Sequence, residues 1–595
     1  MEESPRLERL TTADRRMLLV AVVIAVFSLI IALIYFDDAF PEANIHFEVD
    51  RGESHQIAMS FLQSHGVTIE PWRHASIFSH DNQAKIYLER TLGLDRANRV
   101  IGDSVQIWRW RHRWFQSRQK EEYQVDISPE GVITRYDRTL PEDAGGANLS
   151  REEARDLAAE LLSRELYRDI EELTFVEHAS NVLPNRTDHT FTWEHNRIHP
   201  GEAQYRYEVT IQGDELGGYR EYLKVPEAWQ RDYQQLRSAN TTTGTVASFF
   251  LLLTGLAMLV VLILRARRAD IRWKTALIFG GIAFVLTLAS QLNTFPITVF
   301  NYSTKEAFGD FILQQIFMAI LQALLVGGGI FFLTAAAEPL YRERYGKKLS
   351  LSRAFTMKGF RTKKFFFALV IGLVMTCFFM AYQTIFYLVA SEFGAWSPAD
   401  IPYSDLLNTA VPWIFVLLMG FFPAVSEEFI SRMFSIPFLE KFLKSRWLAV
   451  LIPALIWGFG HAGYPNQPFY IRGLEVSIAG VIIGFLMLRF GIVAALIWHY
   501  TVDAFYTAFL LFGSGDTYFV ISGGISAGLF LLPLLASVYF YLRRGGFRPA
   551  TGVTNSDEGT APPRESEEPS PVQVTYHPLP RRTLLIGLLA GVIIG

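Results

Sequence analysis

The sequence predicts a polytopic α-helical membrane protein of about ten spans, with an α+β domain outside the cytoplasm. Half of the 595 residues are hydrophobic and 14% are aromatic, and the mean hydropathy is positive, which is unusual for a soluble protein of this size. Several apolar runs reach the roughly 20 residues that a helix needs to cross a bilayer. One long polar segment, residues 37–243, separates the first of these runs from the others.

Ten apolar runs are interpreted as membrane spans. They cover residues 17–36, 244–264, 274–293, 311–335, 364–390, 409–434, 446–463, 474–489, 491–512 and 518–542. No small-residue cleavage site follows the first run, which is therefore expected to be a retained anchor. Residues 583–595 form a shorter apolar segment, and its entry into the membrane is left open.

Clusters of arginine and lysine indicate the orientation. They precede the first span and recur in alternate connections, with the largest cluster at residues 336–363. Ten spans place all of these clusters on one side, which is expected to be the cytoplasm of a bacterial cell. Residues 1–16 and a disordered, Pro/Glu/Ser/Thr-rich tail at 543–582 are then cytoplasmic, and residues 37–243 lie outside.

Residues 37–243 are expected to form an α+β domain. Alternating residues at 123–127 and 132–136 flank a Ser-Pro-Glu-Gly turn, which predicts a hairpin. Ser150 and Glu153 form a capping box ahead of a helical stripe. Further elements are expected at 54–62 (helix), 191–193, 205–211 and 221–225 (strands). The hairpin and capped helix resemble PepSY-type modules, with two small repeated units as one arrangement.

The net charge and the cysteine content argue against a nucleic-acid-binding protein and against a fold held by disulfides or by a cysteine-bound zinc ion. The net charge of −4 gives no basis for a nucleic-acid partner. The one cysteine, Cys377, lies in an apolar run, which excludes an intrachain disulfide framework and a cysteine-based zinc site.

The sixth predicted span contains two adjacent carboxylates, Glu427 and Glu428. An ionisable side chain inside a bilayer costs a few kcal/mol, so such a pair requires a reason. Glu428 and Arg432 are four residues apart on one helix face and can form an ion pair. Glu427 points elsewhere without a local counter-ion, which suits a general base. The alternative is a salt bridge at the end of a span.

Two neighbouring spans contribute histidines. His461 follows a Gly-Phe-Gly sequence in the seventh span, whose glycines are expected to let another backbone or a substrate come close. His499 and Asp503 share a face of the ninth span. Helical rise places His461 deeper than Glu427, so we expect a later start of its span or a break at residues 458–460. A packing role is the alternative for His461. The concentration of polar groups in three spans predicts one shared site. Glu475 and Arg489 bracket the eighth span and are expected to mark its ends.

These motifs resemble the CAAX protease and bacteriocin-processing family of intramembrane endopeptidases, which includes Rce1-type and Abi proteins. The family pattern is E-E-x-x-x-R, then F-x-x-x-H, then H-x-x-x-N or a related polar residue in place of the asparagine. The chain has the first in full at 427–432, places Trp457 at the aromatic position of the second, and has Asp503 in place of the asparagine. The resemblance covers residues 364–512 and implies a protease-like membrane domain over 364–542.

The resemblance also implies roles for these residues. Glu427 would activate the attacking water, His461 would contact that water or the oxyanion, and His499 with Asp503 would stabilise the oxyanion. Glu428 and Arg432 would be structural. The family is usually described as metalloproteases, so Zn²⁺ bound by His461, His499 and Glu427 is possible.

The implied substrate is a membrane protein or peptide, such as a prenylated CAAX-like protein. A non-proteolytic scaffold or sensor of the same fold, with the outer domain binding a ligand, is the alternative function. A carrier is a third possibility, although no inverted repeat supports it. A scaffold should tolerate Glu427→Gln, whereas a protease should not.

Overall fold

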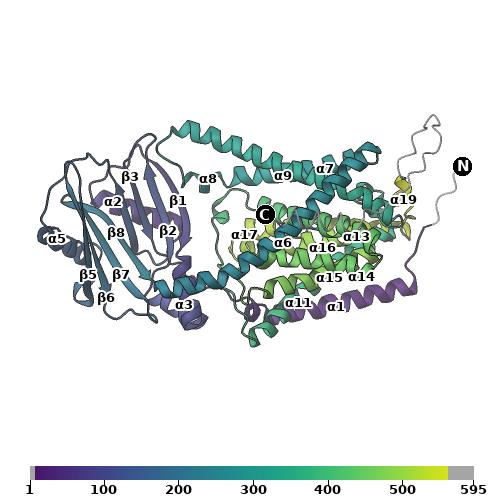
Figure 1. Cartoon of the computed structure of the whole chain (residues 1–595), viewed down its shortest axis with the longest axis horizontal. Helices are drawn as coiled ribbons and strands as arrows, with labels where there is room; N and C mark the ends of the chain where they lie inside the picture. Colours follow the sequence, from purple (N-terminus) through teal and green to yellow (C-terminus); the bar gives the residue numbers. More distant parts are fainter. Residues whose placement is uncertain (1–6, 560–595) are drawn as a thin grey trace, which may run out of the picture. The chain divides into compact units, whose positions relative to one another are not determined.

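The computed structural model describes residues 7–559. Within this part of the chain, eight helical segments are long and apolar enough to cross a membrane. They are α1 (Thr12–Ala39), α6 (Glu227–Arg267), α7 (Trp273–Asn293), α9 (Phe308–Arg344), α11 (Lys363–Glu392), the continuous segment Trp413–Leu443, α15 (Ile471–Phe490) and α16 (Ile492–Phe512) (Figure 1). The pair α17 (Thr517–Ala527) and α18 (Leu531–Arg544), bent by 61°, adds a ninth if it is counted as one span. The chain is an integral membrane protein.

One predicted span is shorter than expected. The run at 446–463 forms α14 (Arg446–Gly460), which has 15 residues and is followed by a 3-10 turn at His461–Gly463. At 1.5 Å per residue this helix is about 22 Å long, less than the roughly 30 Å of a hydrocarbon core. Helix α14 is therefore shorter than a full membrane span, and it ends just before His461.

Residues 43–225, here called the sheet domain, contain one antiparallel sheet of eight strands in the order β1-β2-β3-β4-β8-β7-β6-β5. Its elements are α2 (Arg51–Ser64), β1 (Arg73–His80), α3 (Asn82–Leu92), α4 (Leu94–Asp103), β2 (Trp108–Phe115), β3 (Glu122–Ile127), β4 (Ile133–Thr139), α5 (Arg151–Arg164), β5 (Leu173–Val182), β6 (Thr187–His195), β7 (Gln204–Gln212) and β8 (Glu215–Lys224). The predicted hairpin is confirmed as β3–β4, and the capping box of Ser150 and Glu153 as the start of α5.

The sheet is built from two similar halves. In each half a helix with a capping box precedes four antiparallel strands: Asp50 caps α2 and pairs with Glu53, and Ser150 caps α5 and pairs with Glu153. The halves meet where β4 pairs with β8. This arrangement matches the expectation of two repeated units, and the PepSY resemblance stays a prediction.

The ends of several helices that carry basic residues contact one another. Arg265 at the end of α6 and Lys441 near the end of α13 (Ser435–Leu443) both form ion pairs with Glu343 of α9. Arg344 of α9 lies 2.7 Å from Glu440 of α13. The basic ends therefore lie together at one end of the bundle, as the orientation argument requires.

Residues 549–558 differ from the expected disordered tail. Val553 and Asn555 are buried, and the Asn555 side chain donates a hydrogen bond of 2.9 Å to the carbonyl oxygen of Tyr345. Backbone bonding to the connection between α9 and α11 orders this polar segment, a long-range contact that composition does not reveal. The predictions for residues 560–582 and 583–595 fall outside the described residues.

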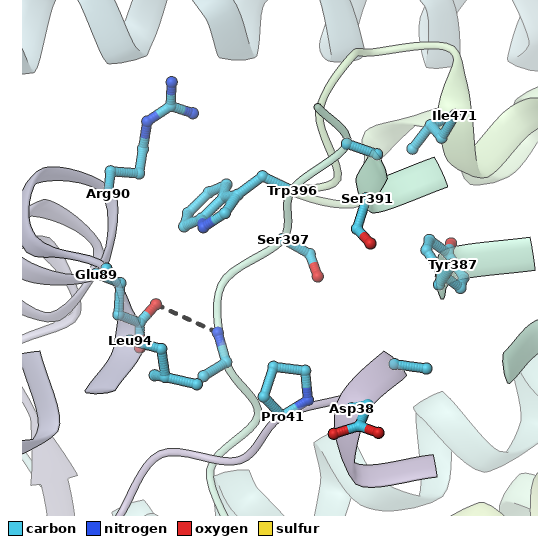
Figure 2. A pocket seen from close by; sticks show the side chains of 14 residues that line it. Asp38, Pro41, Glu89, Arg90, Leu94, Tyr387, Ser391, Trp396, Ser397 and Ile471 are labelled. Atoms are coloured by element: carbon cyan, nitrogen blue, oxygen red, sulfur yellow. Dashed lines mark hydrogen bonds between the residues drawn. The ribbon is translucent and has the colours of Figure 1, made fainter. Parts of the chain in front are cut away.

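The sheet domain contacts the connection that follows α11. Lys85 and Glu89 of α3 form a buried ion pair of 2.8 Å, and Glu89 accepts a hydrogen bond from the backbone of Ala399. Figure 2 shows this contact beside a cavity of about 450 Å³, in which the guanidinium of Arg90 lies 5.0 Å from the Trp396 ring. These contacts fix the connection against the domain.

Candidate active site

The two adjacent carboxylates lie where an α-helix becomes a π-helix. Helix α12 (Trp413–Glu428) ends with Glu427 and Glu428, a π-helical turn follows at Phe429–Phe434, and α13 continues to Leu443. The predicted span ended at 434, because Lys441 and Lys444 were taken to mark a connection. The helix in fact extends to Leu443, so Glu427 lies near its middle. Single π-turns inside α-helices are frequent at functional sites.

This longer helix resolves the expected difference in depth. Glu427 lies sixteen residues before the end of α13, and His461 lies fifteen residues after the start of α14. These separations correspond to about 24 and 22 Å along two helices joined by a short connection. Glu427 and His461 therefore lie at the same level, and no break at residues 458–460 is needed.

Glu428, Arg432 and His499 form a buried polar cluster. Arg432 Nη1 donates to Glu428 Oε1 over 3.1 Å, and His499 Nδ1 lies 2.8 Å from the same oxygen. The guanidinium of Arg432 also stacks 4.0 Å from the Trp457 ring. The i, i+4 pair predicted from the sequence is present, and it fixes the orientation of the His499 ring.

Glu427 faces both histidines. Its Oε2 lies 4.0 Å from His461 Nε2 and 3.7 Å from His499 Nε2, and 29% of its side chain is exposed. The same oxygen accepts a hydrogen bond from the Trp457 indole. Sequence reasoning missed this donor, because it treated Trp457 only as an aromatic at a family position.

The His461 ring is held by its own helix end. Its Nδ1 lies 2.8 Å from the carbonyl oxygen of Trp457, so Nδ1 donates and Nε2 points its lone pair toward Glu427. The following turn is anchored by Asn240 of α6, a buried amide that donates to the carbonyl oxygens of Ala462 and Tyr464. Helix α6 therefore fixes the position of His461.

Asp503 completes the group. It lies on α16 one turn after His499, with Oδ2 3.4 Å from His499 Nε2 and 28% of its side chain exposed. Glu427, His461, His499 and Asp503 all line one cavity of about 230 Å³. The convergence that the sequence predicted from three helices is present in the structure.

Glu475 corrects one sequence interpretation. It was taken with Arg489 to mark an end of the eighth span, yet it is fully buried, 2.6 Å from Arg472 and 3.2 Å from the Gln383 side chain. Its i, i+3 spacing from Arg472 allows a buried pair one turn inside the helix. Arg472 and Gln383 line the same cavity as the four residues above, and hydropathy alone did not reveal them.

Residues 409–505 match the family model described as type II CAAX prenyl endopeptidase Rce1-like. The chain carries an Rce1-like domain. The match begins just before α12 and ends within α16, so it includes all six residues predicted for the site. It indicates an intramembrane protease of the CAAX type, which acts on a membrane-associated peptide in a lipid environment.

One curated relative extends beyond the Rce1-like domain. The chain is 19% identical over 484 residues to the sporulation-killing factor biosynthesis protein SkfC of Bacillus subtilis (strain 168). The aligned region covers 79% of this chain and 91% of the relative. The similarity therefore includes parts of the chain outside residues 409–505. No solved structure matches the chain.

The residues of the Rce1-like domain fit a zinc ion poorly. Both ring nitrogens of His499 face carboxylate oxygens, Glu428 at 2.8 Å and Asp503 at 3.4 Å, an arrangement that favours a hydrogen on each nitrogen and leaves no lone pair for a metal ion. Glu427 Oε2 already accepts from Trp457. Within residues 7–559, the group of three whose ligand atoms all lie within 4.8 Å of one another is found elsewhere, in the sheet domain. Zn²⁺ at this site stays a prediction.

Gly458 of the Rce1-like domain sets the distance between two helices. A Cβ at Gly458 would lie 2.1 Å from Ser477 Oγ and 2.7 Å from the carbonyl oxygen of Gly473, both on α15. A Cβ at Gly460 would meet only Leu251, at 3.8 Å. The glycine expected from the sequence to allow a close backbone approach is therefore Gly458.

We expect Gly458→Ala to displace α14 from α15 and to move His461. Overpacking of this kind costs about 1–3 kcal/mol, so the thermal unfolding temperature in detergent should fall. The matched variant Gly460→Ala should unfold like the wild type. Equal unfolding temperatures for the two variants would contradict the packing argument.

Proposed function

We propose that this chain is an intramembrane endopeptidase that hydrolyses a peptide bond of a membrane-associated protein or peptide with water activated by Glu427. The observation that carries the proposal is the position of the Glu427 carboxylate, 4.0 Å from His461 and 3.7 Å from His499 inside one polar cavity. Placing an ionisable group within a membrane costs free energy, and the convergence of several such groups is typical of a functional site.

The separations suit a bridging water. Direct N–H···O hydrogen bonds are about 2.7–3.2 Å long, so contacts of 3.7 and 4.0 Å leave Glu427 and the histidines unbonded to each other. A water between these groups would donate one hydrogen to Glu427 and the other to His461 Nε2. Its oxygen lone pair would then be free to attack a carbonyl carbon.

The chemical step follows from this arrangement. Glu427 accepts a proton as the water oxygen bonds to the scissile carbonyl carbon, and the carbonyl oxygen becomes an oxyanion. The N–H at His499 Nε2 stabilises that negative charge. Protonated Glu427 then gives its proton to the amide nitrogen as the C–N bond breaks, which releases an amine and a carboxylic acid, and the acid loses its proton to the regenerated Glu427 carboxylate or to water.

The other residues position this machinery. Glu428 and Arg432 hold the His499 ring, and Asp503 faces the second ring nitrogen. Trp457 orients Glu427 through its indole N–H. No step is routed through a metal ion, because the donor set fits one poorly.

The orientation belongs to the same proposal. Basic helix ends that lie together are expected on the cytoplasmic side of a bacterial plasma membrane. Helix α6 connects the sheet domain at Glu227 to this basic end at Arg265, so the sheet domain lies on the opposite side. The similar Bacillus protein is named for the biosynthesis of a killing factor. By analogy, the substrate is a precursor that awaits processing.

The test compares cells that express the wild-type chain with cells that express Glu427→Ala at the same level. We expect at least one membrane protein or peptide to accumulate in an uncleaved form in the variant, as measured by mass spectrometry of new chain ends. Identical chain ends in the two membranes would overturn the proposal. With that substrate, purified protein in detergent should keep its cleavage rate after chelation of divalent metals.

A further inference from the structure

Three histidines gather in the sheet domain, away from the residues discussed above. His55 lies on α2, His74 on β1 and His112 on β2, and one ring nitrogen of each lies within 4.8 Å of the others. His112 is buried, and His55 and His74 are half-buried. The three elements belong to the first half of the sheet domain, where α2 lies against the strands (Figure 1).

The sheet register brings the rings together. β1 and β2 pair with His74 opposite Trp114 and Ser76 opposite His112, so His74 and His112 are diagonal neighbours on one face. His74 Nε2 lies 3.1 Å from His112 Nδ1. Helix α2 covers this face, and the ring of His55 lies 4.1 Å from the His74 ring between centroids.

A hydrogen bond fixes which ring nitrogen of His112 carries the lone pair. The Ser54 hydroxyl donates to the carbonyl oxygen of Arg51, so its oxygen accepts from His112 Nε2, 3.0 Å away. His112 Nδ1 therefore carries the lone pair and accepts a hydrogen bond from His74 Nε2, so a metal ion would replace this bond once the His74 hydrogen moves to Nδ1. Metal-bound histidines are held in this manner, with the second nitrogen donating to a neighbouring acceptor.

Burial also favours the neutral form of the three rings. Burial lowers the pKa of His74 to about 3 and that of His112 to about 2, and burial also lowers the pKa of His55. A neutral imidazole binds a metal ion through its lone pair and need not first release a proton. Arg51 contributes positive charge nearby and further disfavours the protonated rings of His74 and His112.

The second half of the sheet provides an internal comparison. The sequence His-Ala-Ser occurs at 74–76 and again at 178–180, and His178 Nε2 lies 3.0 Å from His189 Nδ1 in the equivalent strand pair. The third position differs. His55 is five residues after the N-cap of α2, and the corresponding residue of α5 is Arg155, whose guanidinium lies 4.8 Å from the Phe175 ring.

We propose that His55, His74 and His112 bind one divalent transition-metal ion of the Zn²⁺, Co²⁺ or Cu²⁺ class. Three imidazoles are a common ligand set for these ions, with metal–nitrogen distances of about 2.0–2.1 Å. Ligand nitrogens of a tetrahedral site lie about 3.4 Å apart, close to the 3.1 Å between His74 and His112. Rotation of the half-buried side chains closes the larger separations.

A cavity gives access to the fourth coordination position. It has a volume of about 570 Å³ and is lined by His55, His74, Trp114 and the segment 66–70. A water or an exchangeable ligand could complete the coordination there, as in zinc sites that keep one open position. The site lies outside the Rce1-like domain, so the inference does not depend on the proposed function.

The test measures binding of Co²⁺ and Zn²⁺ by the purified full-length chain in detergent, in the Glu427→Ala background, which removes one possible ligand at the other site. We expect one Co²⁺ per chain with visible d–d absorption, displaced by Zn²⁺. The variant His55→Arg copies the second half of the sheet and should lower the affinity at least tenfold. His178→Ala is the matched control and should bind like its parent.

Thermal unfolding of the metal-free proteins checks the fold of each variant. His55 is half-buried at the edge of the cavity, so His55→Arg should unfold at the same temperature as its parent. Added Zn²⁺ should raise that temperature in the parent and in His178→Ala, but not in His55→Arg. Equal Co²⁺ affinity in the parent and in His55→Arg, or no binding by the parent, would overturn the proposal.

Discussion

Replacing Glu427 by glutamine should reduce peptide hydrolysis by about 100- to 10,000-fold, the usual contribution of a general base. Glutamine keeps the size of the side chain and can still accept the hydrogen bond from the Trp457 indole. It cannot take a proton from water at neutral pH. The defect should therefore appear in kcat, measured by single-turnover cleavage of a substrate identified from cell membranes.

The matched control for this variant is Glu392→Gln. Glu392 ends α11 and is exposed, so its change removes one carboxylate without touching the cavity. Cleavage by Glu392→Gln should equal that of the wild type. Full activity of Glu427→Gln, with normal expression and unfolding temperature, would exclude Glu427 as the base and favour a non-proteolytic scaffold or sensor.

Replacing Arg432 by methionine should destabilise the protein by about 3–5 kcal/mol, because it leaves Glu428 buried without its charge partner. Both side chains are almost entirely buried, and the Arg432 guanidinium also contacts the Trp457 ring. The Glu428 carboxylate would also lose the contact that keeps it in position to orient the His499 ring. Thermal unfolding in detergent, followed by tryptophan fluorescence, measures the change.

A surface ion pair provides the comparison for Arg432→Met. Arg231 and Glu227 are also four residues apart on a helix, but their side chains are 75% and 68% exposed. Exposed pairs contribute about 0–1 kcal/mol, so Arg231→Met should change the unfolding temperature little. If the two variants unfold at the same temperature, the buried pair of Glu428 and Arg432 does not contribute about 3–5 kcal/mol to stability.

The sequence predicted the membrane fold and the members of the site because charged side chains in apolar runs stand out. Glu428 and Arg432 were paired correctly from their spacing, and His499 was placed correctly beside Asp503. Helical periodicity determines which residues of one helix share a face. It was therefore sufficient for contacts within a helix.

Contacts between helices were less predictable. Glu475 was placed at a span end, although it pairs with Arg472 inside the bundle. The indole of Trp457 was not recognised as a donor to Glu427, since nothing local brings the two together. Strand β2 was not predicted, although its Trp and Arg residues alternate and their burial alternates in the structure.

The π-helical turn at Phe429–Phe434 also constrains the length of the chain. Such a turn is geometrically equivalent to one residue inserted into an α-helix. Because the turn absorbs the extra residue, deleting one residue there would restore an α-helix and leave the segments before and after it in nearly the same orientation. The consequence falls on the turn itself: a single-codon deletion at 429–431 would change the four-residue spacing of Glu428 and Arg432 and so remove the pairing that holds His499.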